Sequence, residues 1–372
     1  MEQGIYDNIP NADYHSGPGI SKSGLDLIAK SPAHYFHAIN AANDNEPTDA
    51  QAFGTAFHAL LLEPEEFKKT YVVELCRDDW PDAIDDKSVL INMVKKINET
   101  RLPKLSVTGS KSDLINRICD NDKQYVPADF SVSKTDELKY ILDEMNKTRG
   151  GLYPITGGTD QLAEIIRENG VNIQLWSEVK EQFAKECEGR IVLSKSNYDK
   201  LIEMRDAVMA HPAARYLLSL EGKAEQSVYW TDPQTGVLCR CRPDFWATQA
   251  DIIVDLKTCV DASQEAFAKS ISNWRYHVQD SMYREGCEAV TGRPQKFVFL
   301  AVEKGACVVN GVAKGVGVYI LDDESQDAGF KEYRQALNTY RECITTDTWP
   351  GYDTKIQIVS LPAWAIKKSE LA

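Results

Sequence analysis

The sequence lacks the features that mark several large classes of protein. No apolar run approaches the roughly 20 residues that a membrane-spanning helix needs, and residues 297–302 are among the longest such runs. The opening residues, MEQGIYDNIPNADYH, have neither a basic start nor an apolar centre, so we expect no secretion signal. Hydrophobic residues make up 43% and charged residues 26% of the 372, which excludes a mainly disordered or collagen-like chain.

Basic residues are scarce relative to acidic ones. The chain has 42 lysines and arginines against 56 aspartates and glutamates, a net charge of −14. This balance disfavours a protein that coats nucleic acid, because phosphate binding needs clustered positive charge. It does not exclude an enzyme that holds DNA in one local groove, since divalent metal ions can supply positive charge at the reacting phosphate.

Motifs for other cofactors are also missing. The nine cysteines are an odd number and are scattered, which predicts reduced thiols in the cytoplasm. Cys239 and Cys241 have no second pair at the spacing of a zinc site, and only Cys343 lies near the carboxyl end, so we expect neither zinc nor an iron–sulfur cluster. No phosphate-binding loop is present, which fits a protein that does not hydrolyse ATP.

Hydrophobic spacing predicts helices up to residue 220 and a mixture of strands and helices from residue 226 onward. The predicted helices before the core are residues 19–40, 51–62 and 192–220. Alternation at 226–229 and 237–242 around a turn at 232–236 predicts a hairpin. The remaining predicted elements are a strand at 251–257, a helical stretch at 262–287, strands at 296–302 and 315–321, and a helix at 332–343. This order indicates an α/β or α+β core, and we expect an α/β fold with a mixed sheet flanked by helices.

Residues 76–175 contain an internal repeat at a spacing of 48. Eight residues recur: Leu90, Asn98, Thr100, Arg101, Thr108, Gly109, Leu114 and Ile118 match Leu138, Asn146, Thr148, Arg149, Thr156, Gly157, Leu162 and Ile166. Each copy is interpreted as a helix, a glycine-containing turn and a second helix. We therefore predict a duplicated helical module inserted into a core made of residues 1–75 and 176–372.

Three residues in one segment predict a metal site. Asp244 follows a strand-like stretch, and Asp255 and Lys257 lie on the same face of the apolar strand that comes next. Two carboxylates brought together by a hairpin can bind Mg²⁺ or Mn²⁺ through oxygen ligands. A lysine one strand step from a ligand can orient the attacking water or stabilise developing charge. Alone, the triplet is also compatible with solvated charges at the end of a strand.

Pro243-Asp244 with Asp255-Leu256-Lys257 is the pattern of the PD-(D/E)xK nuclease superfamily. Longer stretches resemble the catalytic region of the RecE-type exonucleases of prophages (exonuclease VIII). The stretches are GIYDNIPNADYHSGPGISKSGLDLIAKSPAHY, FGTAFHALLLEPEEF, YWTDPQTGVLCRCRPD, YHVQDSMYREG, FVFLAVE and LPAWA. The resemblance covers residues 4–74 and 176–366 and implies a PD-(D/E)xK core.

The resemblance also implies individual roles. The implied metal ligands are His58, Asp244, Asp255 and the backbone carbonyl of Leu256. Lys257 would be the catalytic lysine. Gln279 and Tyr283 match a Gln-x-x-x-Tyr motif and would position the scissile phosphate or the terminal nucleotide, one helical turn apart. Cations expected along the DNA groove, or alternatively plain surface charges, are Arg240, Arg242, Arg275 and Arg284.

The function implied by the resemblance is a metal-dependent, ATP-independent exonuclease. It would degrade linear double-stranded DNA from 5′ ends and leave 3′ single strands for recombination by annealing. Mg²⁺ is the implied cofactor, with Mn²⁺ as a substitute. The implied partners are double-stranded DNA ends, a single-strand annealing protein of the same prophage, and further copies of the chain in a ring, typically a tetramer; no membrane is involved. An endonuclease, or a catalytically silent protein that binds DNA ends or a partner, remains the alternative.

The first copy of the inserted module, residues 105–118, resembles the second half of a SAP motif, a small DNA-binding unit. There Gly109 would make the turn, and Lys111 and Arg117 would contact phosphates. The second copy has Thr159 and Ile165 at these two positions, which weakens the DNA-binding interpretation. A role in protein interaction or as a spacer stays open.

Overall fold

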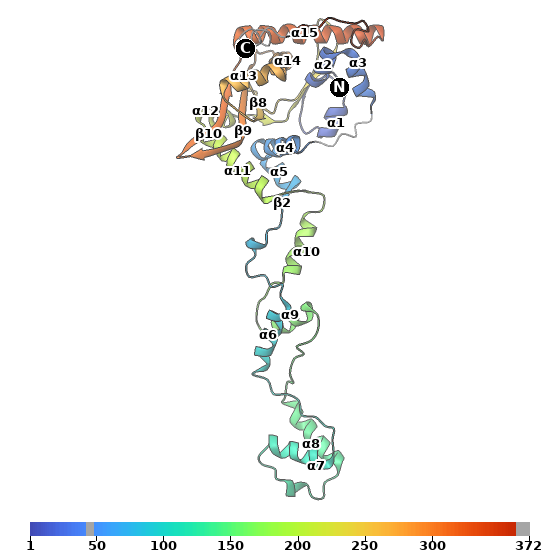
Figure 1. Cartoon of the computed structure of the whole chain (residues 1–372), viewed down its shortest axis with the longest axis vertical. Helices are drawn as coiled ribbons and strands as arrows, with labels where there is room; N and C mark the ends of the chain where they lie inside the picture. Colours follow the sequence, from blue (N-terminus) through green and yellow to red (C-terminus); the bar gives the residue numbers. More distant parts are fainter. Residues whose placement is uncertain (42–47, 362–372) are drawn as a thin grey trace. The chain divides into compact units, whose positions relative to one another are not determined.

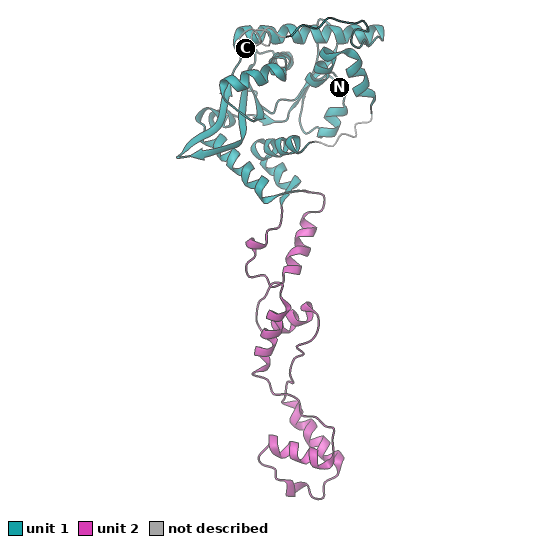
Figure 2. Cartoon of the chain, viewed as in Figure 1, with its two compact units in different colours: residues 1–73, 192–372 teal, residues 74–191 magenta. Residues whose placement is uncertain are grey.

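The computed structural model describes residues 1–41 and 48–361, which divide into two units (Figures 1 and 2). The core comprises residues 1–73 and 192–372, and the insertion comprises residues 74–191. Residues 176–191 thus group with the insertion, whereas the sequence-based division placed them in the core. The end of the LPAWA stretch, residues 362–365, lies outside the described residues.

The core contains both helices and strands throughout its length. Its helices are α1 (Asn11–Ser16), α2 (Lys22–Lys30), α3 (Pro32–Asn40), α4 (Asp49–Leu62), α5 (Pro64–Thr70), α11 (Lys195–Ala210), α12 (Pro212–Leu218), α13 (Gln264–Asn273), α14 (Tyr276–Thr291) and α15 (Asp323–Thr346). Its strands are β1 (Gly4–Tyr6), β2 (Tyr71–Val73), β4 (Lys223–Ala224), β5 (Ser227–Thr231), β6 (Leu238–Cys241), β7 (Phe245–Ala247), β8 (Ile252–Cys259), β9 (Lys296–Val309) and β10 (Val312–Tyr319). β3 (Ile191–Leu193) pairs with β2. Within the described parts of the chain, no helix combines the length and the apolar character needed to cross a membrane.

The main sheet has five strands in the order β10-β9-β8-β7-β4. β8 and β9 run parallel, and the other neighbours are antiparallel, so the sheet is mixed. The predicted hairpin is confirmed as β5 and β6, which form a second sheet with β1. The expected α/β fold with a mixed sheet flanked by helices is confirmed (Figure 1).

Alternation along the central strands gives each face of the main sheet its own apolar cluster. Val254 and Leu256 pack with buried side chains of α4, α11 and α12 on one face. Ile253 packs with α13, α14 and α15 on the other. Because successive side chains of a strand point to opposite faces, Asp255 and Lys257 project toward the α14 face, as predicted. One eight-residue strand therefore supplies apolar side chains to one face of the sheet and the polar pair to the other.

Three predicted helical stretches are each interrupted in the structure. The stretch at 192–220 begins in β3 and divides into α11 and α12, the second of which begins at Pro212. The stretch at 19–40 divides into α2 and α3 because Pro32 cannot continue the first helix and instead begins the second. The stretch at 262–287 divides into α13 and α14 at Arg275, whose backbone is left-handed, with φ 54° and ψ 41°. Neither charge nor hydrophobic period at Arg275 predicts this break.

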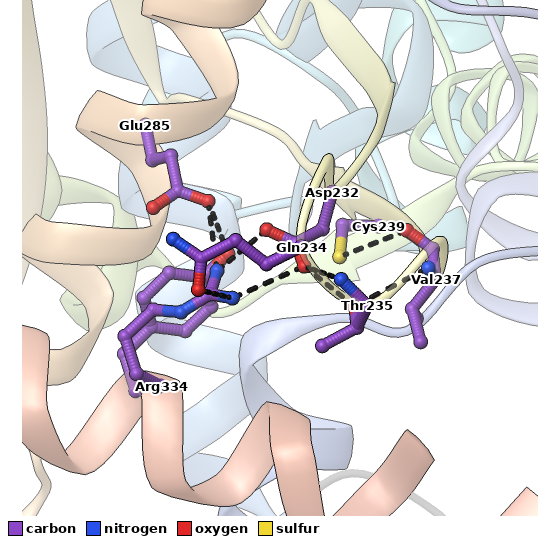
Figure 3. Close-up of polar contacts among 8 residues, drawn as sticks. Asp232, Gln234, Thr235, Val237, Cys239, Glu285 and Arg334 are labelled. Carbon is purple, nitrogen blue, oxygen red and sulfur yellow. Dashed lines mark hydrogen bonds and ion pairs between the residues drawn. The ribbon is translucent and has the colours of Figure 1, made fainter.

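A buried ion pair joins α15 to the β5–β6 hairpin (Figure 3). Arg334 donates to both carboxylate oxygens of Asp232, at 2.5 and 3.1 Å, and only 1% of Asp232 is exposed. Asp232 also accepts from the backbone N–H and the hydroxyl of Thr235, which closes the turn at 232–236. Burial alone would raise the pKa of Asp232, but the bonds from Arg334 and Thr235 outweigh it and lower that pKa.

The insertion consists of helices and loops. Its elements are η1 (Arg77–Asp79), α6 (Lys87–Asn98), α7 (Lys111–Asn121), η2 (Pro127–Phe130), α8 (Thr135–Lys147), α9 (Thr159–Glu168) and α10 (Trp176–Glu186). The first repeat copy supplies α6 and α7, and the second supplies α8 and α9. In the structure α6 packs on α9 and α7 packs on α8. Each packed pair therefore takes one helix from each copy.

Equivalent hydrogen bonds show that the exchange is reciprocal. The side chain of Asn98 pairs with both backbone groups of Tyr153, at 2.9 and 2.8 Å. The side chain of Asn146, its repeat equivalent, pairs in the same way with Leu105, at 2.8 and 2.7 Å. Tyr153 and Leu105 are themselves separated by the repeat spacing of 48. The recurring asparagines thus lock each copy to the other.

The SAP-like features of the first copy serve the local structure. Gly109 and its equivalent Gly157 have φ of 130° and 138°, which favours glycine at both positions before α7 and α9. Arg117 donates to the carbonyls of Ser106 and Thr108, at 2.6 and 3.0 Å. Arg117 therefore fixes the loop that leads into its own helix, and its predicted phosphate contact would require these bonds to break.

The ion pair of α15 predicts a large stability loss on truncation. Arg334→Leu leaves the buried Asp232 carboxylate without its partner, and we expect the free energy of unfolding to fall by about 3 kcal/mol. Urea denaturation measures this change. Arg341→Leu, the same substitution at an exposed position of the same helix, should change stability little. Equal stability of the two variants would contradict the role of the pair.

The reciprocal exchange predicts that one repeat period can be removed. Deleting residues 105–152 joins the α6 side directly to the α9 side, and these two helices already pack together. We expect the shortened insertion to stay folded, with helical circular dichroism reduced only by the loss of α7 and α8. Rapid proteolysis within the remaining insertion, while the core stays intact, would show that the two helix pairs depend on each other.

Candidate active site

A short hairpin brings two acids of the site together. β7 and β8 are antiparallel, with Phe245 opposite Val254, so Asp244 at the start of β7 faces Asp255 on β8. The Asp244 carboxylate also accepts a 2.7 Å hydrogen bond from the backbone N–H of Leu256. Burial raises the pKa of Asp244, while the charge of Lys257 and this hydrogen bond lower it in part.

His58 reaches the same point from α4. Thr48 and Gln51 form a capping box that begins this helix, and His58 lies in its third turn with Nδ1 3.7 Å from a carboxylate oxygen of Asp244. Burial, followed by the charge of Lys257, lowers the pKa of His58 to about 4. The imidazole is therefore neutral at physiological pH, which is the form that binds metal ions.

Glu225 is a third acid at this point, and the sequence patterns did not reveal it. The β4–β7 pairing places Ala224 opposite Phe245, so Glu225 lies beside Asp244, and its N–H donates to the Asp244 carbonyl at 3.2 Å. Potential ligand atoms of His58, Glu225 and Asp244 all lie within 4.8 Å of one another. The only sequence signal was an acidic residue at the start of the predicted hairpin, with no motif spacing to distinguish it.

Asp255, also predicted as a metal ligand, has different contacts from the three clustered donors. It is fully buried, and its two oxygens contact Lys257 Nζ at 2.6 Å and Gln279 Nε2 at 2.5 Å. Burial raises the pKa of Asp255 to about 6, although the charge of Lys257 opposes the shift. Burial acts against the charge of Lys257 as well, but Asp255 and Asp244 outweigh it and raise the pKa of Lys257. Lys257 therefore remains positively charged.

The remaining predicted site residues lie around this centre. Gln279 contacts Asp255 directly, and Tyr283 follows one turn later on α14, where its ring packs edge-on against Phe297. Burial raises the pKa of Tyr283 well above its usual value, so its hydroxyl is neutral. A backbone hydrogen bond links Leu256 to His58, which places this part of the strand beside the histidine. The structure thus gathers all seven predicted residues in one region of the core.

Sequence comparison connects this arrangement to a known domain family. Residues 163–362, more than half of the chain, match the family described as "PDDEXK-like domain of unknown function (DUF3799)". The chain belongs to this family. The match includes every acid of the site, Lys257 and the Gln-x-x-x-Tyr pair, whereas His58 lies before it.

Other comparisons add less. No curated protein matches the sequence. Among solved structures, a crystal structure of a "Putative exonuclease" from Eubacterium rectale matches 99% of each chain, with 10% identity and a TM-score of 0.45. At that TM-score the likeness carries no argument about activity.

The donor set of the PDDEXK-like domain fits a hard divalent cation. Two carboxylates and a neutral imidazole converge in a half-buried volume, and oxygen donors are what Mg²⁺ and Mn²⁺ prefer. Burial, followed by the charge of Asp244, raises the pKa of Glu225 to about 8, which means that nearby positive charge does not compensate these acids. A bound cation would supply that charge.

Two of the four arginines expected along a DNA groove of the PDDEXK-like domain are buried instead. Arg240 donates to the carbonyls of His15, Gly17 and Pro18. The guanidinium of Arg242 bonds Ser227 and lies 3.9 Å from the ring centroid of Tyr14. Both arginines fasten the N-terminal segment to β6, so the groove interpretation is wrong for them.

The other two arginines of the set pair with acids. Arg275 contacts Asp26 and Glu332, and Arg284 contacts Asp280 at 2.7 Å. Their charge is therefore already partnered. Asp280 and Arg284 have the i,i+4 spacing of a helical ion pair, whereas Asp26 and Glu332 lie on other helices and no sequence pattern relates them to Arg275.

The acids of the PDDEXK-like domain predict how stability changes with pH. Glu225 holds a proton up to about pH 8 in the folded protein, whereas the unfolded chain releases it near 4.5. The metal-free protein should therefore lose stability as pH rises between these values, and a divalent cation should restore it. Thermal melting at pH 6 and pH 8.5, with and without Mg²⁺ or Mn²⁺, should show the larger metal-induced rise in Tm at pH 8.5.

Glu225→Gln removes the titrating group and one potential ligand. Its metal-free Tm should depend less on pH than that of the wild type, and the metal-induced rise should shrink. Glu221→Gln, a change of an exposed acid four residues earlier, is the matched control. An unchanged metal-induced rise in Glu225→Gln would exclude Glu225 as a ligand.

Proposed function

We propose that the chain is a metal-dependent, ATP-independent exonuclease that digests linear double-stranded DNA in the 5′ to 3′ direction. The observation that carries the proposal is the convergence of His58, Glu225 and Asp244 beside the Asp255–Lys257 pair. Membership of a PDDEXK-like family supports phosphodiester hydrolysis. The resemblance to RecE-type exonucleases along the flanking stretches supports the direction and the preference for ends.

Each side chain of the site has a distinct task in this proposal. His58, Glu225 and Asp244 would hold the cation, with Asp255 adjoining them. The cation, when bound, would lower the pKa of a water molecule and offset charge on the phosphate. Lys257 is held in its charged form by Asp255, so its ammonium group can orient the attacking water and stabilise the negative charge that develops.

Gln279 fixes the orientation of Asp255, the carboxylate that pairs with Lys257. Its amide donates to one oxygen of Asp255, which leaves the other oxygen directed at Lys257. The carboxylate is thus fixed from two sides before substrate arrives, and a preorganised group does not have to reorient during the reaction.

The wider biological role is part of the proposal. The 3′ single strands would be substrates for a single-strand annealing protein of the same prophage, in DNA recombination. A ring of several copies, typically four, would keep an acidic protein on DNA by encircling it rather than by a large basic surface. All nine cysteines lie among the described residues and are free thiols, which supports a cytoplasmic location.

Linear duplex DNA labelled separately at the 5′ and 3′ ends tests the activity and its direction together. With Mg²⁺ and no ATP, we expect early loss of the 5′ label, and Lys257→Ala should slow it by about 10²- to 10⁴-fold. Lys331→Ala, which removes an exposed lysine of α15, should act like the wild type. Circular dichroism checks that Lys257→Ala is folded.

Two outcomes would favour the competing functions. Cutting of covalently closed plasmid DNA would identify an endonuclease. No digestion by folded wild-type protein in either Mg²⁺ or Mn²⁺ would favour a catalytically silent protein that binds DNA ends or a partner.

A further inference from the structure

One large aromatic side chain is exposed on the turn between α13 and α14. Trp274 is 66% exposed and directly follows α13. The two residues before it, Ser272 and Asn273, are exposed and polar, and Arg275 follows it. An exposed indole contributes little to the stability of the fold, which leaves the ring of Trp274 available for binding.

Contacts connect the backbone of Trp274 to the catalytic lysine. The Nζ of Lys22 donates to the Trp274 carbonyl at 2.7 Å and lies 5.8 Å from the ring centroid of Tyr276. The Nζ of Lys257 lies 4.9 Å from the same ring. The turn that carries the indole is therefore built against the ring that also borders Lys257.

The same turn is held rigidly although its backbone is unfavourable. Arg275 has a left-handed conformation, which side chains other than glycine rarely adopt. Its guanidinium contacts Asp26 at 3.2 Å and Glu332 at 3.3 Å, and Asp26 also contacts Lys22 at 2.7 Å. Such conformations persist where the surroundings determine them, often at functional sites. Trp274 is thus presented from a fixed backbone.

We propose that Trp274 stacks on a nucleobase at the end of the strand being cut and so positions its terminal phosphodiester. The proposal rests on the proposed nuclease function and deepens it. Every base has an aromatic face, so stacking on tryptophan is strong and tolerates any sequence, as an exonuclease requires. An indole carried on this fixed turn would hold the strand end by stacking, without a basic groove.

Substrates that lack a single base test the contact directly. A duplex with an abasic residue at the first, second or third position from the digested end is compared with an intact duplex in single-turnover cleavage. Wild-type cleavage should slow by about tenfold or more at one of these positions. Trp274→Ala should be slow on the intact duplex by a similar factor and indifferent to the abasic residue, whereas Trp274→Phe should keep most of the wild-type response.

Trp80→Ala is the matched control, because Trp80 is a partly exposed tryptophan of the insertion. It should behave like the wild type on every substrate. Equal sensitivity of wild type and Trp274→Ala to the abasic residues would overturn the proposal. A change in sedimentation of Trp274→Ala with an unaltered abasic response would also overturn it and assign the indole to a contact between proteins.

The experiment separates this inference from the proposed function. Failure of the wild type to digest the intact duplex would contradict the nuclease itself. Digestion by the wild type and by Trp274→Ala at the same rate would leave the nuclease standing and remove Trp274 from it.

Discussion

An imbalance of buried charge governs the candidate active site. Three carboxylates, from Glu225, Asp244 and Asp255, share the region with one ammonium group, that of Lys257, and His58 is neutral. Burial raises the pKa of each acid. Ions are costly to bury unless they are paired. The fold therefore keeps a place in which positive charge is lacking, and a divalent cation is the group whose charge and donor preference match it.

The rest of the core holds the strands and helices that carry these residues in position. The two faces of the main sheet are filled by separate apolar clusters, so β8 is fixed on both sides while it carries Asp255 and Lys257. The Asp232–Arg334 pair ties α15 to the β5–β6 hairpin (Figure 3). Arg240 and Arg242 use their charge internally to fasten the N-terminal segment. The positive charges of Arg240, Arg242 and Arg334 thus stabilise the fold, and Lys257 remains beside the acids of the site.

In the insertion, the two repeat copies make equivalent hydrogen bonds, but each copy makes them with the other. Asn98 and Asn146 make the same bonds, yet each bonds the loop of the other copy. Each copy therefore supplies the asparagine that holds the loop of the other copy. The exchange makes two small helix pairs from two repeats, and each pair has its own apolar cluster.

Local sequence is sufficient to predict the mixed α/β core, the existence of the repeat and most of the site. Alternation in β8 places Asp255 and Lys257 on one face, and the preceding hairpin brings Asp244 to them, whereas His58, Gln279 and Tyr283 were predicted from a family resemblance. These features depend on local periodicity or on a recognisable pattern. Strand pairing alone revealed Glu225, since no spacing relates it to Asp244 until β4 and β7 lie side by side.

Tertiary structure decided where charges and helices find their partners. The buried roles of Arg240 and Arg242, the break at Arg275, and the exchange of helices between the repeat copies all depend on residues that are distant in the chain. A sequence pattern reports the period of one element. Which element lies opposite is decided by packing, because burial favours whichever surfaces complement each other irrespective of their separation along the chain.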